Sequence, residues 1–285
     1  MRLFKNNKLV ALITVFSLTL GVVTLTYASE SERRLVVTGG TLTEIVFALG
    51  GGTHVVAVDS SSLYPLAATQ LPQVGYYRSL AAEGVLAQRP SELWALAGTG
   101  SGQTLEQIAA TGVQVRSFAK PETVAELYDL IAEVGAALQQ EHVARELIVE
   151  LQSDLAEIAK DIEQQPTTKQ AIFVLQASER GVVVAGDQTV PHLLMQEAHV
   201  QNVVSHNGFK PVTLEFLALQ QPDFLIAPAH VVQAAGGREA FCQAPTLQLI
   251  HAAQRCDLLV MDSLLALGMT PRLATAIREL SAYVR

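Results

Sequence analysis

The segment with the most evident chemistry is Tyr76-Tyr77-Arg78, which follows Gly75 and precedes a predicted short helix. A loop that leaves a glycine and enters a helix often presents its side chains to a ligand. Tyrosine phenolate is a hard anionic oxygen ligand of the kind that ferric iron prefers. A nearby guanidinium and a ferric ion both favour the ionised phenol. The segment therefore predicts a site for ferric iron.

The N-terminal residues 1–28 are predicted to be a signal peptide. Three basic residues and no acidic one precede an apolar run at 9–25, and the small residue Ala28 ends a typical cleavage pattern. An uncleaved membrane anchor is the alternative, because the run approaches the ~18 residues that a membrane span needs. The Thr and Ser content of the run favours cleavage after Ala28. We therefore expect an exported protein of a bacterial periplasm.

The charge of the mature chain limits its partners. Removal of 1–28 leaves 16 Lys and Arg against 27 Asp and Glu, so the net charge falls from −8 to −11. Nucleic acid and anionic membranes are unfavourable partners for such a surface. An anionic ligand can bind only where basic residues gather. The length suits one large domain or two of modest size, and we expect a monomer.

The first half of the chain alternates strand and helix signals. Four short apolar strands are expected at 35–37, 55–58, 92–96 and 113–115, with helical patterns between them. This alternation is typical of a parallel sheet covered by helices. Thr41 and Glu44 fit a capping box at the start of the first helix.

The middle of the chain, 122–165, is helical in periodicity and contains no proline. We expect one helix to end near Leu138, a bend near Gln139-Gln140, and a second helix over 141–164. At 1.5 Å per residue the second helix is ~36 Å long. Its many charged residues fit either a solvated coiled-coil helix or a spine that joins two lobes. The spine is the better interpretation, because a second βα series starts immediately afterwards.

That second series completes the predicted fold, an α/β protein of two Rossmann-like lobes joined by a long backbone helix. Its strands are expected at 171–175, 182–184, 224–226 and 258–260, and a closing helix follows Pro271 and runs to about Val284. The predicted boundaries are an N-terminal lobe at 29–140, a linking helix at 141–165 and a C-terminal lobe at 166–285.

The two halves share a short pattern of a glycine, a glutamate and a proline. The first copy is Gly75, Glu83 and Pro90, and the second is Gly208, Glu215 and Pro222. The glutamate-to-proline spacing is the same in both copies, and an apolar strand follows each proline. The pattern supports two pseudo-symmetric lobes that face each other across a cleft, where ligands commonly bind.

Two cysteines, Cys242 and Cys256, lie in a chain expected in an oxidising compartment. A disulfide between them would stabilise the fold by roughly 3 kcal/mol. Two separate buried thiols remain an equal alternative, because the sequence does not give the distance between their Cα atoms.

Several segments together carry a resemblance to a known family. They are 39–46, 56–59, 71–78, 83–84, 184–186, 208–211, 221–223 and 260–262. Over essentially the whole mature chain the sequence resembles the periplasmic haem-binding proteins of ABC-type haem importers. These are class III substrate-binding proteins, a class with a helical backbone that also carries cobalamin and ferric siderophores. The Tyr-x-Arg loop is the most specific part of the resemblance.

The resemblance implies that Tyr76 is the axial ligand of a transported ferric haem, and that Arg78 lies beside it. Arg78 could instead pair with a haem propionate. Tyr77 could be a ligand, a stacking residue or a core aromatic residue, and the last two roles are favoured. Tyrosine is an established ligand of haem iron.

Some members of the family have a second axial ligand, a histidine in the loop after the first strand of the second lobe. The corresponding loop here, 176–181, has none, so we expect five-coordinate iron, with Arg180 as a propionate partner. Lys210, in a matching segment, is a further haem-binding candidate. His206 is the best alternative ligand for haem iron or for a propionate.

The resemblance also implies partners in transport. Glu83 and Glu215 would contact arginines on an inner-membrane permease dimer, whose ATPase powers import. An outer-membrane haem receptor system would act upstream. The alternative is that both glutamates are ordinary solvated helix residues. The rigid spine implies little hinge motion between the lobes.

Other functions fit the sequence less well than haem binding. The nearest is a ferric siderophore or cobalamin carrier, and a manganese- or zinc-binding protein is a weaker one. An exported hydrolase or haem-modifying enzyme would need a nucleophile and a base, but Ser178, Ser205 and His206 fit no nucleophile elbow or triad pattern. The chain is therefore expected to bind rather than catalyse. Tyr76 and Arg78 distinguish haem binding from the other functions.

Overall fold

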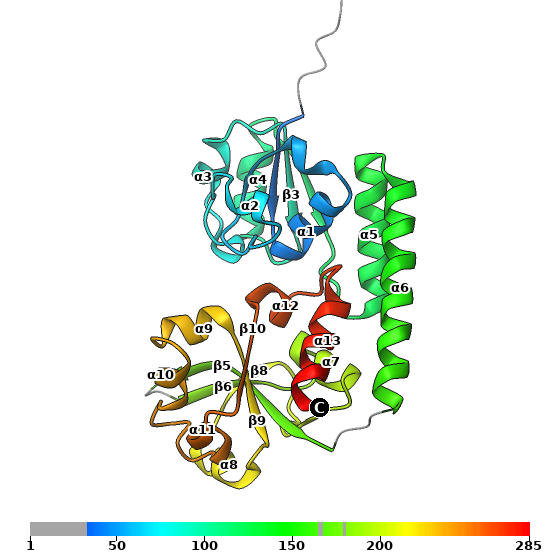
Figure 1. Ribbon diagram of the computed structural model, residues 1–285. Helices are drawn as coiled ribbons and strands as arrows, with labels where there is room; N and C mark the ends of the chain where they lie inside the picture. Colours follow the sequence, from blue (N-terminus) through cyan, green and yellow to red (C-terminus); the bar gives the residue numbers. More distant parts are fainter. Residues whose placement is uncertain (1–32, 165–167, 179–180) are drawn as a thin grey trace, which may run out of the picture. The chain divides into compact units, whose positions relative to one another are not determined.

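Two β-sheets, one from each half of the chain, organise the computed structural model (Figure 1). The structure describes residues 33–164, 168–178 and 181–285. The predicted signal peptide at 1–28 and Arg180 lie outside the described residues. The α/β fold class with a long linking helix is confirmed.

The first sheet is fully parallel, as the alternation of strands and helices predicted. Its strands are β1 (Leu35–Thr38), β2 (Val55–Val58), β3 (Glu92–Leu96) and β4 (Gln114–Phe118), in the order β2-β1-β3-β4. The α-helices of this half are α1 (Gly40–Ala48), α2 (Leu66–Thr69), α3 (Ala82–Leu86) and α4 (Gly102–Ala109). All four residues of β1 are buried, as expected for a central strand with helices on both faces.

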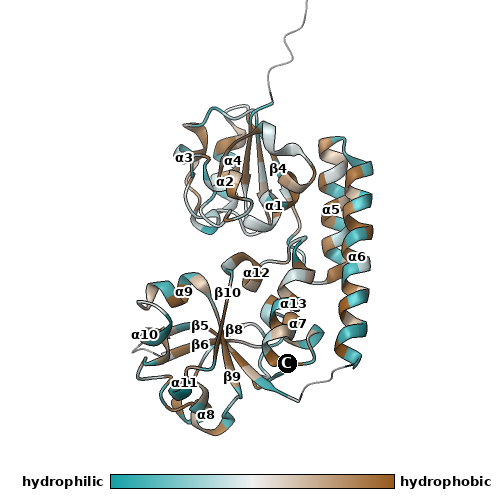
Figure 2. Ribbon diagram, viewed as in Figure 1, coloured by the Kyte–Doolittle hydropathy of each residue, from teal (hydrophilic) through white to brown (hydrophobic). Residues whose placement is uncertain are grey.

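The linking helices begin and end where the sequence predicted. Helix α5 (Val124–Leu138) and helix α6 (Glu141–Gln164) pack against each other, and Gln139 between them adopts a left-handed conformation with φ 58°. Along α6 the buried residues Ala144, Leu151 and Ile158 recur every seven positions, which gives one narrow apolar stripe. The rest of α6 is largely polar, so teal and brown alternate along it in Figure 2. This stripe explains how a helix with so many charges serves as a packed spine.

The second sheet is mixed, which corrects the expectation of a second regular βα series. Its strands are β5 (Gln170–Ser178), β6 (Gly181–Ala185), β7 (Gln201–Asn202), β8 (Phe209–Val212), β9 (Phe224–Pro228) and β10 (Leu258–Met261). The order is β10-β9-β5-β6-β8, and β7 pairs with β5. Strands β10, β9 and β5 are parallel, but β6 is antiparallel to both of its neighbours. The reason is the short connection from β5 to β6, since a parallel crossover needs a dozen or more residues.

Seven helices of the described residues surround the second sheet or close the chain. They are α7 (Val190–Glu197), α8 (Leu214–Gln220), α9 (Ala229–Ala234), α10 (Arg238–Cys242), α11 (His251–Arg255), α12 (Ser263–Leu267) and α13 (Leu273–Val284). The closing helix is confirmed. Cys242 and Cys256 form a disulfide, with Cα atoms 5.4 Å apart, which decides between the two alternatives. Within the described ranges, no helix combines the length and apolar character needed to cross a membrane.

The predicted capping box is wrong. Helix α1 begins at Gly40 with Gly39 as its N-cap, so Thr41 is a residue of the first turn rather than the cap. Glu44 makes a different contact: its carboxylate accepts hydrogen bonds from the Arg272 side chain at 3.1 and 2.9 Å. This ion pair joins α1 to the residue that precedes α13.

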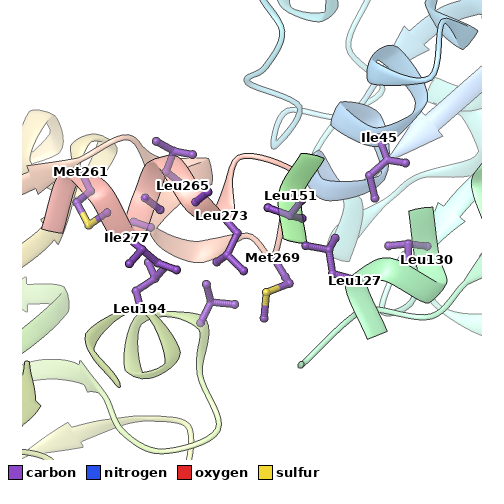
Figure 3. Close-up of a cluster of buried hydrophobic side chains, with 14 of the residues drawn as sticks. Ile45, Leu127, Leu130, Leu151, Leu194, Met261, Leu265, Met269, Leu273 and Ile277 are labelled. Carbon is purple, nitrogen blue, oxygen red and sulfur yellow. The ribbon is translucent and has the colours of Figure 1, made fainter. Parts of the chain in front are cut away.

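One of three hydrophobic clusters in the described residues runs from the first sheet through the spine to the second sheet. Figure 3 shows part of it, with Ile45 of α1, Leu151 of α6 and Ile277 of α13 among the labelled side chains. Burial of one such side chain contributes about 1.5–3 kcal/mol. The small hinge motion expected from the sequence stays a prediction.

The glycine–glutamate–proline pattern is confirmed as a structural repeat. Gly75 (φ 97°) and Gly208 (φ 75°) both have positive φ, a conformation that favours glycine. Each glutamate lies in the first turn of a short helix, α3 or α8. The residue before each proline, Arg89 or Gln221, has positive φ as well. Strands β3 and β9 then follow at equivalent places.

Candidate functional site

A cleft of about 620 Å³ is lined by residues from both halves of the chain. Its volume lies in the range of small-molecule sites. Its lining includes the aromatic and polar side chains of Tyr76, Tyr77, Arg78, Lys120, Phe209, His230 and Ser263.

The cleft forms where parallel strands end. Five lining residues come two positions after the last residue of a strand: Gly40 (β1), Ser60 (β2), Lys120 (β4), His230 (β9) and Ser263 (β10). The carboxyl ends of parallel strands meet at one edge of a sheet, which is where ligands of open α/β folds bind. The topology therefore gathers side chains that are far apart in the sequence.

The buried carboxylate of Asp59, directly after β2, holds the tyrosine loop in place. One oxygen accepts hydrogen bonds from the Gly39 N–H (2.8 Å) and the Ser62 hydroxyl (2.8 Å). The other accepts from the Ser61 N–H (2.9 Å), the Ser61 hydroxyl (2.6 Å) and the Tyr77 N–H (3.3 Å). Because one side chain satisfies donors from three segments, the loop is fixed relative to the start of α1.

The two adjacent tyrosines have different environments. Gly75 turns the chain, after which Tyr77 is buried (9% exposed) whereas Tyr76 is 46% exposed on the cleft. Their rings meet edge to face, with centroids 5.1 Å apart. The Tyr77 hydroxyl accepts a hydrogen bond from Arg78 Nε at 2.9 Å. Tyr76 is therefore the phenol that the loop exposes in the cleft.

The cations near the tyrosine loop favour a negatively charged ligand. Burial raises the pKa of Tyr77, and the Arg78 guanidinium offsets this only in part, so Tyr77 stays neutral. Burial opposes the charge of Arg78, but the phenol oxygens of Tyr77 and Tyr76 outweigh it and raise the Arg78 pKa. Burial and the charge of Arg78 lower the pKa of Lys120. An anion between Arg78 and Lys120 would relieve their repulsion.

The second half of the chain contributes an aromatic surface and a histidine. Phe209 of β8 is 40% exposed and lines the cleft. His230, at the start of α9, is also exposed there, and its Nδ1 lies 2.7 Å from Ser263 Oγ. Burial lowers the pKa of His230, so its imidazole is neutral at pH 7.

The structure brings together only part of the predicted residue set. Tyr76, Tyr77 and Arg78 line the cleft. Lys210 is exposed on β8 beside Phe209 and is absent from the described lining, since neighbouring strand residues point to opposite faces. Both ring nitrogens of His206 are buried and find no hydrogen-bond partner among the described residues.

Glu83 and Glu215 are exposed in the first turns of α3 and α8. They occupy equivalent places in the structural repeat, outside the described lining of the cleft.

Four residues with roles in the cleft were not predicted from sequence: Asp59, Lys120, His230 and Ser263. Each follows the end of an observed strand by one or two residues, but only Asp59 directly follows a strand with its predicted end, at 55–58. Within the described ranges, no group of three or more His, Cys, Asp or Glu side chains is placed to hold a metal ion.

The chain belongs to the periplasmic binding protein family, whose model matches residues 35–265. Three similar solved structures are periplasmic heme-binding proteins. RhuT from Roseiflexus sp. RS-1 in apo form is 29% identical (TM-score 0.83, covering 89% of this chain and 98% of that one). BhuT in complex with two hemes is 30% identical (TM-score 0.80, covering 89% of this chain and 99% of that one). A heme-binding protein from Pseudomonas aeruginosa is 31% identical (TM-score 0.79, covering 88% of this chain and 92% of that one).

A curated relative, the vitamin B12-binding protein of Yersinia pestis, is 29% identical over 125 residues. The match covers 43% of this chain and 44% of the relative, so it spans less than half of that protein's length. The family and the solved neighbours are binding proteins.

Proposed function

We propose that this chain is an exported carrier, not an enzyme, which binds ferric haem in the cleft and delivers it to the permease of an ABC importer. One observation carries the proposal: a well-exposed phenol, Tyr76, faces a cleft of about 620 Å³ beside the cations of Arg78 and Lys120. Phenolate oxygen suits ferric iron, and the cations suit haem carboxylates. The three similar solved structures are heme-binding proteins, which agrees with this chemistry.

Each side chain has a distinct part in holding the ligand. Tyr76 would bind the iron, Arg78 and Lys120 would pair with propionates, and Phe209 would contact the porphyrin face. Tyr77 would hold Arg78 through its hydroxyl.

The remaining residues predicted from the sequence, Arg180, Lys210 and His206, would contribute less to haem binding. Arg180 would be a further propionate partner, whereas Lys210 lies outside the described lining of the cleft and is a weaker candidate. His206 is the weakest candidate, because its ring nitrogens are buried in the described structure.

The alternative function is that of a cobalamin or ferric siderophore carrier. The partial match to a vitamin B12-binding protein supports the cobalamin alternative. Purified residues 29–285 should be titrated with hemin, cobalamin and a ferric siderophore, with the visible spectrum as the readout. We expect a stoichiometric haem spectrum and no saturable binding of the other two ligands. Saturable cobalamin binding without a haem complex would replace the proposal by the alternative.

Glu83 and Glu215 are proposed to dock the loaded protein onto arginines of the permease dimer. The pKa of Glu215 is lowered by its backbone N–H and by the Thr213 hydroxyl, so this exposed carboxylate is ionised near pH 7. Glu83→Ala and Glu215→Ala should leave the hemin spectrum unchanged but reduce haem uptake in cells that depend on this carrier, and the double variant should reduce it most.

The matched control for docking is Glu197→Ala, an exposed glutamate on α7 outside the repeat. It should leave uptake unchanged. Equal uptake in the wild type and in all four variants, or loss of hemin binding in the Glu83 or Glu215 variant, would argue against docking.

The proposed setting is the periplasm, after removal of residues 1–28. The mature chain would act as a monomer, with the proposed boundaries at 29–140, 141–165 and 166–285. It would receive haem that an outer-membrane receptor system supplies.

A further inference from the structure

A second cavity, of about 400 Å³, lies where the first half of the chain meets the spine and the closing helix. Its wall comes from α1, from the loop before α2, from α6 and from the start of α13. Among the described residues, it shares no lining side chain with the cleft that contains Tyr76. Its volume lies in the range of small-molecule sites. The cavity is therefore a separate candidate for ligand binding.

Part of the cavity lining is apolar. Leu147 and Leu151 lie one turn apart on α6, and Phe47 faces the same cavity from α1. Leu151 is buried, whereas Leu147 and Phe47 are half-buried, so these two still have apolar surface to cover. Pro65 and Ala274 add further apolar surface. A ligand with an apolar body would be stabilised here by its removal from water.

Tyr64, Arg272 and Glu44 form a wall of the cavity whose side chains hold one another. Arg272 Cζ lies 3.6 Å from the centroid of the Tyr64 ring, and the guanidinium donates to both carboxylate oxygens of Glu44 at 3.1 and 2.9 Å. The charges of Glu44 and Arg272 compensate each other. Because these side chains are already fixed, a ligand that contacts them loses little affinity to their ordering.

The uncompensated charge of the lining is negative. Glu150 and Asp154 line the cavity from α6 and lie four positions apart, which places them on one face of the helix. Asp154 pairs with Arg278 of α13 at 3.2 Å, but within the described part of the chain Glu150 has no ion-pair partner. Like charges at this spacing repel each other. A cation beside the two carboxylates would relieve that repulsion.

The cavity and the cleft differ in the sign of their charge. The described lining of the cleft holds Arg78 and Lys120 and no carboxylate, so an anion is favoured there and disfavoured in the cavity. We propose that the cavity binds a small amphipathic cation, a primary amine whose apolar body is about the size of a phenyl group. Its ammonium pairs with Glu150 and Asp154, and its apolar body packs against Phe47. This inference does not depend on the proposed haem-carrier function.

The first test compares three probes of similar shape and different charge: phenethylamine, 2-phenylethanol and phenylacetate. Isothermal titration calorimetry of purified residues 29–285 measures their binding. We expect one equivalent of phenethylamine to bind with a Kd below about 1 mM, the neutral alcohol to bind about tenfold more weakly, and the carboxylate not to bind. The inference is overturned if phenethylamine shows no saturable binding, or if the amine and the alcohol bind equally well.

The second test removes the two carboxylates that would hold the ammonium. Glu150→Gln/Asp154→Asn should weaken phenethylamine binding by about tenfold and leave the affinity for 2-phenylethanol unchanged. A change in the shape of the cavity would instead alter both affinities. The matched control is Glu146→Gln, the same change at an exposed position of α6 outside the described lining. It should alter neither affinity. An unchanged affinity for the amine in the double variant would contradict the proposed role of the carboxylates.

The third test locates the bound amine. Thr275 is exposed on α13 at the cavity wall, so Thr275→Trp should fill the cavity and abolish phenethylamine binding. Ala48→Trp, at the exposed end of α1, is a second filling variant. Tyr76→Ala should leave phenethylamine binding unchanged. Thermal melts check that each variant is folded. Amine binding that is lost in Tyr76→Ala but kept in both folded tryptophan variants would place the amine in the cleft and refute the inference.

Discussion

Replacing Tyr76 with phenylalanine is expected to weaken hemin binding by about 100-fold or more and to remove the tyrosinate–iron band from the visible spectrum. The change deletes one oxygen from a side chain that is 46% exposed on the cleft, so it leaves the core intact. A 100-fold loss corresponds to about 3 kcal/mol of binding free energy. Hemin titration of wild type and variant, followed by release to a scavenger protein, measures the effect.

Tyr77→Phe is the matched control, because it deletes the same atom from the neighbouring ring. The Tyr77 hydroxyl accepts from Arg78 Nε, and burial raises the pKa of Tyr77, so it is not the phenolate that iron needs. This variant should keep the tyrosinate band and lose about 1 kcal/mol of stability from one hydrogen bond. The ligand assignment would be wrong if Tyr77→Phe removed the band and Tyr76→Phe kept it.

Replacing Arg272 with methionine is expected to destabilise the fold by about 3–5 kcal/mol, the usual cost of leaving a buried partner charge unpaired. The side chain of Glu44 is only 3% exposed, and Arg272 donates hydrogen bonds to both of its carboxylate oxygens. The guanidinium also lies 3.6 Å from the centroid of the Tyr64 ring. The pair joins α1 to α13, so its loss weakens the contact between the two halves. Urea unfolding measures the cost.

The cost of Arg272→Met should grow as the pH rises from 4 to 7. Burial raises the pKa of Glu44 above its ordinary value even though Arg272 lowers it. Without Arg272 that pKa rises further. A carboxyl whose pKa is higher in the folded state contributes stability at low pH and loses it as the pH rises through that value. Between pH 4 and 7 the free energy of unfolding of Arg272→Met should therefore fall by more than that of the wild type.

Two further variants give this prediction its controls. Arg278→Met removes a half-exposed partner of Asp154, and we expect it to cost at most about 1 kcal/mol. The double variant Glu44→Met/Arg272→Met removes the buried carboxylate as well and should recover much of the lost stability. Equal costs for Arg272→Met and Arg278→Met, without pH dependence, would show that the buried pair contributes no more than a surface pair.

The sequence by itself determined most of the secondary structure of the described residues. The bounds of α5 and α6 follow from a long run of helical periodicity without proline, and most of the parallel strands are short apolar runs between turn residues. It also identified the loop that presents Tyr76, because Gly75 and the adjacent aromatic residues form a local pattern. The glycine–glutamate–proline repeat was visible in the sequence for the same reason. These features depend on residues that are neighbours in the chain.

Only the tertiary structure decided which distant residues meet. The partner of Glu44 is 228 positions away, and this contact replaced the predicted capping box. His230 and Ser263 are 33 positions apart and meet because β9 and β10 are adjacent parallel strands that end at the same edge. The pairing of Cys242 with Cys256 was likewise decided by packing. Periodicity and turn chemistry report local preference, whereas a site built from the ends of several strands requires the order in which those strands pair.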